Sequence, residues 1–207
     1  MKLKALLIGG LVLIFLSSKA QLITYRGLSN KYVYKIGIIK KIDTNGINKE
    51  SKISLFIFNK RDKLIQTIHF KEDLLFDTVF KDNKNVRSYV TGKNKDAEVS
   101  DYDFGDLVIA DLNFDGREDI AVKYDSGGNS GPSYNFYMQD NSGRFWKDNY
   151  LTTYVASFPR YINRKNKTIT TQIHATFDQE GRKTFKHNGK TRKWHLVKWV
   201  MVEAGDG

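Results

Sequence analysis

The chain has 207 residues, of which 40% are hydrophobic and 28% charged, with 34 Lys and Arg against 23 Asp and Glu. This composition excludes a disordered, collagen-like or disulfide-based protein and favours one folded domain. Because the sequence contains no cysteine, thiol catalysis, cysteine-ligated zinc, iron–sulfur clusters and lipid attachment at cysteine are also excluded.

The first twenty residues have the pattern of an export signal. Lys2 and Lys4 precede an apolar run over residues 5–15, and Ser18 and Ala20 place small residues at the two recognition positions of a cleavage site. The run is shorter than the roughly 20 apolar residues that span a bilayer, and no second apolar stretch follows, so we expect no stable membrane insertion. We predict a signal peptide over residues 1–20, a single domain over 21–207, and a periplasmic or secreted location.

The remaining chain has almost no helical periodicity. Short runs rich in Ile, Val, Thr, Tyr and Phe alternate with turn signals, which is typical of β-strands. The predicted strands are Tyr32–Ile39, Ile53–Asn59, Leu64–Phe70, Val86–Val90, Leu107–Ala110, Ile120–Tyr124, Tyr134–Met138, Thr168–Phe177, Arg182–His187 and Trp194–Val202. For residues 71–80, one short helix is the alternative.

Turn signals separate these runs and indicate a chain of hairpins. The predicted turns are Asp43–Gly46, Asn59–Asp62, Asp140–Gly143, Asp178–Gly181 and Asn188–Gly189, where Asn and Gly tolerate the positive φ of tight turns. The predicted fold is therefore all-β, an antiparallel hairpin meander with either a propeller-like or a sandwich arrangement.

The strongest chemical motif lies in an acidic segment. Residues 96–125 contain ten acids against Arg117 and Lys123, a net charge of −8, and these acids repel one another unless a cation relieves them. Within this segment, Asp111, Asn113, Asp115 and Asp119 place oxygen side chains at positions 1, 3, 5 and 9 of a loop with Gly116 at position 6. This spacing is typical of a tight loop that wraps oxygen ligands around Ca²⁺.

The predicted calcium site uses these four side chains and the backbone carbonyl of Arg117, while Leu112 and Phe114 point away and anchor the loop. An EF-hand is rejected, because its glutamate at position 12 would fall on Val122 and the flanks read as strands. Magnesium is disfavoured because it prefers a stricter octahedral shell. A turn rich in Asp and Asn that binds no metal remains the alternative.

The strand, calcium loop and strand resemble the calcium-binding hairpins of FG-GAP and integrin-type repeats. The wider C-terminal half resembles exported calcium-binding immunity proteins against peptidoglycan-degrading effectors of bacterial secretion systems, which are related to periplasmic lysozyme inhibitors. The matching stretches are Asp106–Val122, Tyr134–Met138, Asp140–Phe145, Asn166–Ile169 and Lys186–Lys190. The resemblance implies a peptidoglycan hydrolase or lysozyme-like protein as partner. Membrane tethering is not carried over, because this chain has no cysteine to lipidate.

The polar, glycine-rich stretch over residues 125–133 is predicted to be an exposed loop. It has no phosphate-binding motif, and a plain connector is the alternative. Ser130, Gly131, Ser133 and Tyr134 resemble the Ser-Gly-x-x-Tyr loop with which periplasmic lysozyme inhibitors plug an active-site cleft. The resemblance implies that the hydroxyls of this loop contact catalytic carboxylates of the partner, with the neighbouring calcium ion holding the base of the loop rigid.

The segment over residues 160–198 is strongly basic, with eleven Lys and Arg against Asp178 and Glu180. Nucleic acid is disfavoured as a partner because an exported protein seldom meets it, whereas lysines on exposed strands protect sheet edges. Anionic cell-surface polymers or an acidic effector protein are the expected partners of this region. Trp194 and Trp199 are expected to serve the core.

Signals of catalysis are scarce, since none of the four histidines lies in a metal-binding pair and no nucleophile elbow is present. We therefore predict a calcium-dependent inhibitor that is not an enzyme. The alternative is a calcium-dependent adhesive or glycan-binding module, for which exposed aromatics beside the ion would dominate. A secreted hydrolase would need a cleft with converging Asp and His, which the sequence does not locate. The oligomeric state is left open.

Overall fold

The computed structural model describes residues 21–42, 48–72, 75–81, 83–128, 130–176 and 178–203. Strands dominate this part of the chain. The first nine are β1 (Gln21–Tyr25), β2 (Tyr32–Ile42), β3 (Asn48–Asn59), β4 (Leu64–Lys71), β5 (Val86–Ser88), β6 (Leu107–Ala110), β7 (Asp119–Asp125), β8 (Ser133–Gln139) and β9 (Phe145–Lys147). A single π-helical turn, η1 (Leu151–Val155), is followed by β10 (Tyr161–Asn163), β11 (Thr168–His174), β12 (Gln179–Asn188) and β13 (Lys193–Glu203).

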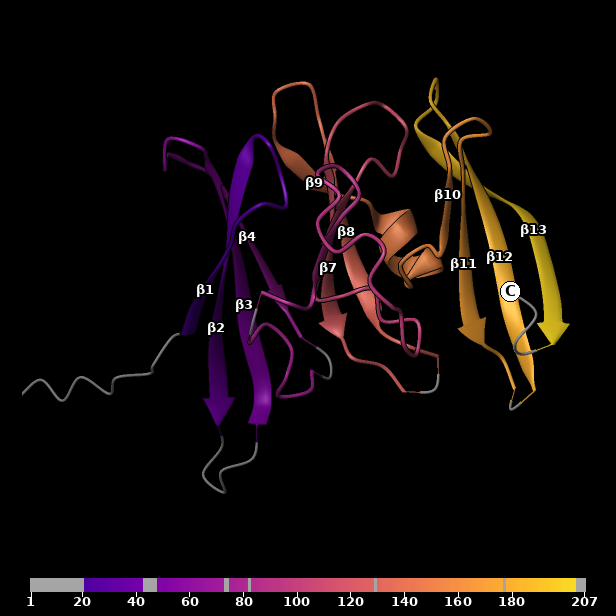
Figure 1. Cartoon of the computed structure of the whole chain (residues 1–207), viewed down its shortest axis with the longest axis horizontal. Helices are drawn as coiled ribbons and strands as arrows, with labels where there is room; N and C mark the ends of the chain where they lie inside the picture. The colour runs from indigo at the N-terminus through magenta and orange to yellow at the C-terminus, as the bar shows by residue number, and fades with distance from the viewer. Residues whose placement is uncertain are drawn as a thin grey trace, which may run out of the picture.

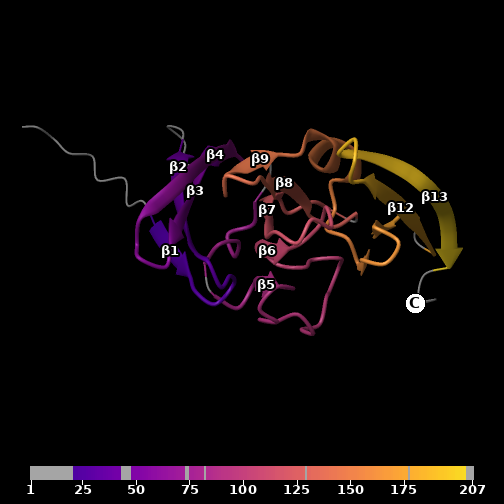
Figure 2. The same cartoon turned by 90° about the horizontal axis from the view of Figure 1, so that it is seen from above.

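These strands form three sheets, which lie in a row (Figure 1). The N-terminal sheet has the order β1-β2-β3-β4 and the C-terminal sheet the order β10-β11-β12-β13, and both are antiparallel meanders. The central sheet has the order β5-β6-β7-β8-β9, and it is mixed because β5 pairs with β6 in parallel. Figure 2 shows the same row from above, with the central sheet between the other two.

The central sheet is buried on both faces, and its sequence shows why. Strand β6 is a continuous apolar run whose side chains alternate between two cores. Leu107 and Ile109 pack with buried residues of the N-terminal sheet, such as Ile36 and Leu55. Val108 and Ala110 join the second core, which the C-terminal sheet and η1 complete. The fold is thus a layered sandwich and not a ring of blades.

The predicted all-β class is confirmed, and every predicted strand overlaps an observed one. The sequence missed the short strands β1, β9 and β10. Residues 77–80 form a turn, and the described residues of the 71–80 segment contain no helix. The predicted signal peptide and the predicted Asp43–Gly46 turn lie outside the described residues.

Two expectations near the C-terminus were wrong. Gly181 lies inside β12, paired with Ile173 and Met201, so the hairpin turn precedes Gln179 and does not include Gly181. Trp194 is buried as expected, but Trp199 is 62% exposed, because the outer half of β13 extends beyond the second core. No helix within the described ranges is long and apolar enough to cross a membrane.

Candidate functional site

The predicted calcium loop connects β6 to β7 in the central sheet. The two strands pair antiparallel, from Leu107 with Val122 to Ala110 with Asp119, so strands and not EF-hand helices flank the loop. Leu112 is fully buried, and the ring centroid of Phe114 lies 6.5 Å from that of Trp194 in the C-terminal sheet. The two apolar side chains therefore anchor the loop as predicted.

The loop curls around its own polar side chains. The carboxylate of Asp111 accepts hydrogen bonds from the backbone N–H groups of Asp115, at 3.0 Å, and Gly116, at 3.2 Å. The side-chain oxygen of Asn113 also accepts from the N–H of Asp115, at 3.1 Å. Gly116 has a φ of +82°, which glycine adopts at little cost. The pattern of Asp, Asn and Gly thus fixes a tight turn.

Asp119 occupies the most buried position of the predicted ligand set, with no exposed surface. Its carboxylate accepts from the N–H groups of Leu112 at 2.9 Å, Asn113 at 3.3 Å and Gln139 at 2.9 Å. Burial raises the pKa of Asp119 to about 8, although these backbone hydrogen bonds act in the opposite direction. Among the described residues no cationic side chain pairs with it, and an uncompensated buried carboxylate is costly.

Two arginines lie against the loop. Arg117 pairs with Asp115, and Nη1 of Arg164 lies 3.2 Å from Oδ2 of Asp111. Arg164 comes from the turn between β10 and β11, so the C-terminal sheet supplies part of the charge that the acidic segment needs. Sequence reasoning missed Arg164, because nothing local links it to Asp111.

The side chains of the 111–119 loop are of the type that binds calcium, but their positions suit an ion less well. The donors are all hard oxygens, and Asp119 has no cationic partner in the part of the chain that the structure describes. Against this, no group of three or more acidic, histidine or cysteine side chains that could hold a metal converges among those residues. Calcium binding by Asp111, Asn113, Asp115, Asp119 and the Arg117 carbonyl stays a prediction.

The predicted partner-binding loop joins β7 to β8. Asp125 accepts a hydrogen bond from the N–H of Gly127 at 2.7 Å, and the N–H of Gly131 donates to the carbonyl of Gly128 at 3.0 Å. Ser130 is exposed, Ser133 is half-buried and Gly131 is buried. A β-carbon at Gly131 would lie 2.8 Å from the carbonyl oxygen of Asp101, so only glycine fits there.

Tyr134 does not fit the contact role that the resemblance implied. Its side chain has no exposed surface and packs against the rings of Phe136 and Phe158. Its N–H donates to the carbonyl of Ala156 at 2.9 Å, and its hydroxyl donates to Asp103 at 3.4 Å. An aromatic side chain next to an apolar sheet face is pulled into the core by its large apolar area. Tyr134 therefore anchors the loop from below.

The two loops lie at opposite ends of β7 (Figure 1). The strand has seven residues, and a strand advances about 3.3 Å per residue, so the loops are separated by about 20 Å. The expectation that a calcium ion would hold the base of the 125–133 loop rigid is therefore wrong. The two loops are close in sequence, but they lie far apart in space because each adjoins a different end of the same strand.

A groove of about 990 Å³ adjoins the 125–133 loop. Ser130, Gly131, Asp101, Asp103 and His174 are among the residues that line it, and they come from three separate segments. The groove thus brings Asp and His side chains together, which the sequence could not show because the segments are far apart in the chain.

A buried ion pair forms the floor of this groove. The ammonium of Lys123 lies 2.7 Å from Asp103 and 3.0 Å from Asp106, and the second oxygen of Asp106 accepts from the N–H of Phe80 at 2.8 Å. Burial raises the pKa of Asp106, and Lys123 opposes that rise. With three acids and one lysine among its lining residues, the groove is acidic.

The backbone at Asp101 and Tyr102, beside the groove, has an unusual conformation. Asp101 and Tyr102 both have positive φ, of 49° and 58°. The Tyr102 hydroxyl donates to Glu180 of β12, and its ring lies 4.8 Å from that of His174. Burial, together with the hydrogen bond to Glu180, raises the pKa of Tyr102 to about 12. The central and C-terminal sheets are thus joined next to the loop.

The comparisons with known proteins bear on the fold. No family model matches the sequence, and no curated protein matches it. Among solved structures, the chain is similar to a Xanthomonas type IV secretion system related protein, with a TM-score of 0.56 and 15% sequence identity. The match covers 91% of this chain and 85% of that chain. The likeness shows that the two proteins share a fold.

Proposed function

We propose that this protein is an exported calcium-binding protein that inhibits a peptidoglycan hydrolase or lysozyme-type enzyme by inserting the 125–133 loop, as an immunity or inhibitor protein. Two observations support an exported protein linked to bacterial secretion systems. They are the sequence resemblance to such inhibitors and a shared fold with a protein described as related to a type IV secretion system. The proposal includes a periplasmic or secreted location and no enzymatic activity.

The single observation that carries the proposal is the construction of the loop. Its base is fixed by Tyr134 in the core and by the close contact of Gly131 with Asp101. The described residues at its tip, Gly128 and Ser130, are small and exposed. A narrow tip on a rigid base enters a cleft with little loss of conformational entropy, so it binds at low cost.

Ser130 is the residue through which the loop acts. Its hydroxyl can donate to a catalytic carboxylate and accept from a neighbouring donor. Tyr134 is excluded from this role by its burial. Ser133, at the start of β8, is half-buried and is therefore less accessible than Ser130. The contact surface therefore comprises the tip of the loop and the rim of the adjoining groove.

The acidic groove predicts the charge of the partner. Asp101 and Asp103 lie next to the loop, and the side chain of Asp103 is 44% exposed. A partner with a basic rim around its cleft would be attracted to this end, which speeds encounter and fixes orientation.

Calcium has a structural role in this proposal. Its predicted loop contacts the C-terminal sheet through Arg164 and Phe114, at the end remote from the 125–133 loop. Bound calcium would stabilise the packing of the central and C-terminal sheets and would not touch the partner.

One observation favours the second candidate, a calcium-dependent glycan-binding module. Trp146 on β9 is 61% exposed, and its indole N–H donates to Asp140 at 2.7 Å. Strand β9 pairs with β8, whose Gln139 donates to Asp119 of the predicted calcium loop. Quenching of tryptophan fluorescence by peptidoglycan fragments, lost in Trp146→Ala, would favour this function.

The proposed function is tested by assaying a panel of peptidoglycan hydrolases, including lysozymes, for lytic activity in the presence of excess protein. We expect at least one enzyme to be inhibited at a 1:1 stoichiometry. Full activity of every enzyme in the panel, with no complex on size-exclusion chromatography, would contradict the proposal.

A further inference from the structure

A cavity of about 690 Å³ lies between the N-terminal sheet and the central sheet, and we refer to it as the β4–β8 cavity. Strand β4 contributes Phe70 to its lining, β8 contributes Asn135 and Tyr137, and η1 contributes Thr152 and Thr153. It shares no lining residue with the acidic groove beside the 125–133 loop. The proposed function therefore makes no use of it.

The short length of β9 explains why this space exists. Strand β9 pairs only with Tyr137–Gln139 of β8, and after its last residue the N–H of Asp148 donates to the carbonyl of Phe136 at 2.8 Å as the chain turns into η1. On β4, the side-chain amide of Gln66 donates to the carbonyl of Phe145 at 2.8 Å and accepts from its N–H at 2.9 Å. The cavity lies beyond this bridge, where no strand in the described ranges separates β4 from β8.

Two polar side chains of β8 that line the cavity have no partner in the protein. Asn135 is 4% and Tyr137 is 5% exposed, and they lie on the same face of β8 because they are two positions apart. Within the described ranges, neither the amide of Asn135 nor the hydroxyl of Tyr137 makes a hydrogen bond. Burial raises the pKa of Tyr137 to about 12, and no neighbouring charge contributes to this rise.

These two polar groups are accessible from the cavity. Atoms that are both unpartnered and fully enclosed occur elsewhere, for example Nδ1 of His187, but the amide of Asn135 and the hydroxyl of Tyr137 are not among them. Because both residues line the cavity, their polar atoms face its interior. Polar groups in such deeply buried residues normally have hydrogen-bond partners, so these two are suited to bind a ligand.

The other walls of the cavity are aromatic or uncharged. Phe70 is half-buried and packs against the core of the N-terminal sheet, and Tyr124 of β7 is also half-buried. Thr153 adds an exposed hydroxyl. Lys71 and Lys147 line the cavity as well, but both are exposed, and no acidic residue is among the described lining residues. The buried polar groups of the cavity are therefore neutral.

We infer that the β4–β8 cavity binds a small saccharide through the amide of Asn135 and the hydroxyl of Tyr137. An amide and a phenol both donate and accept hydrogen bonds, and the hydroxyl and acetamido groups of sugars do the same. The ring of Phe70 offers apolar surface to the C–H face of a sugar ring. A concave site of this size, with aromatic walls and a few polar groups, is typical of small-ligand sites. A charged ligand fits less well because no buried side chain of opposite charge lines the cavity.

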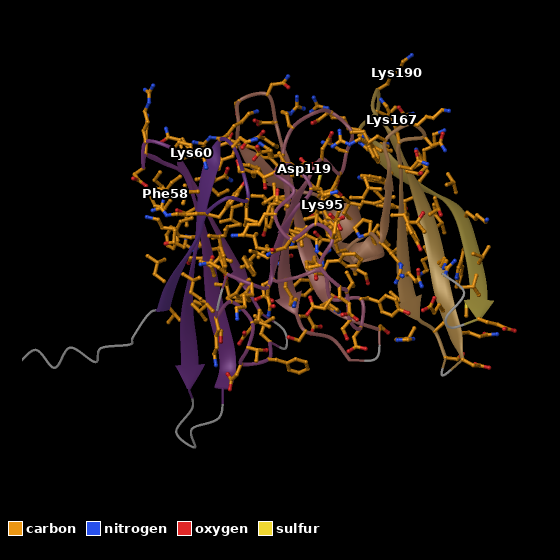
Figure 3. All side chains as sticks on the ribbon, viewed as in Figure 1. Phe58, Lys60, Lys95, Asp119, Lys167 and Lys190 are labelled. Carbon is orange, nitrogen blue, oxygen red and sulfur yellow. The ribbon has the colours of Figure 1, made fainter. Side chains whose placement is uncertain are left out.

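The β4–β8 cavity lies away from the predicted calcium loop. In Figure 3, Asp119 at the start of β7 and Lys60 in the turn before β4 lie toward the same end of the strands. The cavity is lined instead by later residues of these two strands, Tyr124 and Phe70. Trp146, on which the second candidate function depends, is not among its lining residues. Saccharide binding in this cavity therefore requires neither the ion nor that tryptophan.

The inference is tested by calorimetric titration of the protein with chitobiose and with cellobiose, which differ in their acetamido groups. We expect saturable binding of at least one probe and about fivefold weaker binding in Tyr137→Phe, the effect of one lost hydrogen bond. The matched control is Tyr154→Phe, which removes the hydroxyl of a 68% exposed tyrosine outside the cavity. No saturable binding of either probe, or equal affinity of the two variants, would overturn the inference.

A stability measurement separates a binding role from a structural one. Because Asn135 and Tyr137 have no side-chain partner in the described structure, Asn135→Leu and Tyr137→Phe should melt at or above the temperature of the parent protein. A lower melting temperature of Tyr137→Phe would show that its hydroxyl is bonded within the protein and would contradict the inference. The hydrolase assay does not involve this cavity, so failure of either proposal leaves the other standing.

Discussion

Tyr134 shows how a residue chosen from a motif acquires a different role in the fold. As the first predicted residue of β8 it begins a strand whose inner face packs against η1, and its ring is enclosed by Phe136 and Phe158. The tyrosine thus contributes to the rigidity of the loop and not to its chemistry. The same reasoning makes Ser130 the residue at which the proposed function is best examined.

Replacing Tyr134 therefore affects stability first. Removal of a buried aromatic side chain costs about 3–5 kcal/mol, so Tyr134→Ala should lower the midpoint of urea unfolding strongly. Tyr134→Phe keeps the ring and loses one long hydrogen bond, and it should cost about 1 kcal/mol or less. A tyrosine at the surface would make both variants as stable as the parent.

The hydroxyl of Tyr134 also predicts a pH dependence. Burial, followed by the charges of Asp103 and Asp106, raises its pKa well above the usual 10. Because the folded-state pKa is raised, the stability linked to this group is present below about pH 10 and is lost as the pH rises further. Thermal melts between pH 9 and 11.5 should show a smaller loss in Tyr134→Phe than in the parent protein. Parallel curves would count against a buried phenol.

At the scale of the element, the Asp111–Asp119 loop is the feature that the sequence predicted most completely. Its turn, its flanking strands and its anchors are set by residues within the loop, so local spacing is sufficient. The bound ion is not part of that local structure. It must be tested separately.

Calcium in millimolar amounts should raise the melting temperature above its value in EDTA, because a ligand that binds only the folded state stabilises it. Asp115→Ala should abolish this rise. Asp96→Ala, which removes an exposed acid of the same segment, should keep it. A rise that survives in Asp115→Ala would place any calcium elsewhere, and no rise in the parent would leave the metal-free turn.

Most strands could likewise be predicted from the local sequence, and the errors concerned short strands and the positions of turns. Alternating or continuous apolar runs gave β2, β6 and β8, whereas β10 is three residues long and gains its structure only by pairing with β11. Gly181 was read as a turn residue, but the sheet accommodates a glycine opposite Met201. Short strands and exact turns depend on neighbours that one sequence does not reveal.

The candidate sites show the same limit more strongly. The groove depends on Tyr102 reaching Glu180. Arg164 reaches Asp111 across two sheets. These contacts join residues more than twenty positions apart, so composition indicated the charges and only the fold indicated where they meet.

For the whole molecule, the three-layer arrangement separates charge between its ends. The groove at the end that carries the 125–133 loop is acidic, and the cavity that holds Lys167 and Lys190 at the other end is basic. The acidic groove and the basic cavity therefore lie at opposite ends of the strands and not at opposite ends of the row of sheets. A partner bound at the loop leaves the basic pocket open.

This polarity predicts a salt-dependent association with the inhibited enzyme. The association rate should fall as ionic strength increases from about 20 to about 150 mM, because screening weakens long-range attraction. Asp101→Asn should lower the rate at low salt, whereas Asp62→Asn, in an exposed turn of the N-terminal sheet, should not. Stopped-flow measurements that show no salt dependence would argue against an acidic docking end.

The inhibition constant of loop variants tests the central claim most directly. Ser130→Trp adds bulk at the exposed tip of the 125–133 loop, and Asn141→Trp adds the same bulk in an exposed turn at the opposite end. Both should melt like the parent protein. The account predicts that Ser130→Trp weakens inhibition of lytic activity at least tenfold while Asn141→Trp inhibits like the parent. Unchanged inhibition by Ser130→Trp, or equal weakening in both variants, would contradict insertion of this loop.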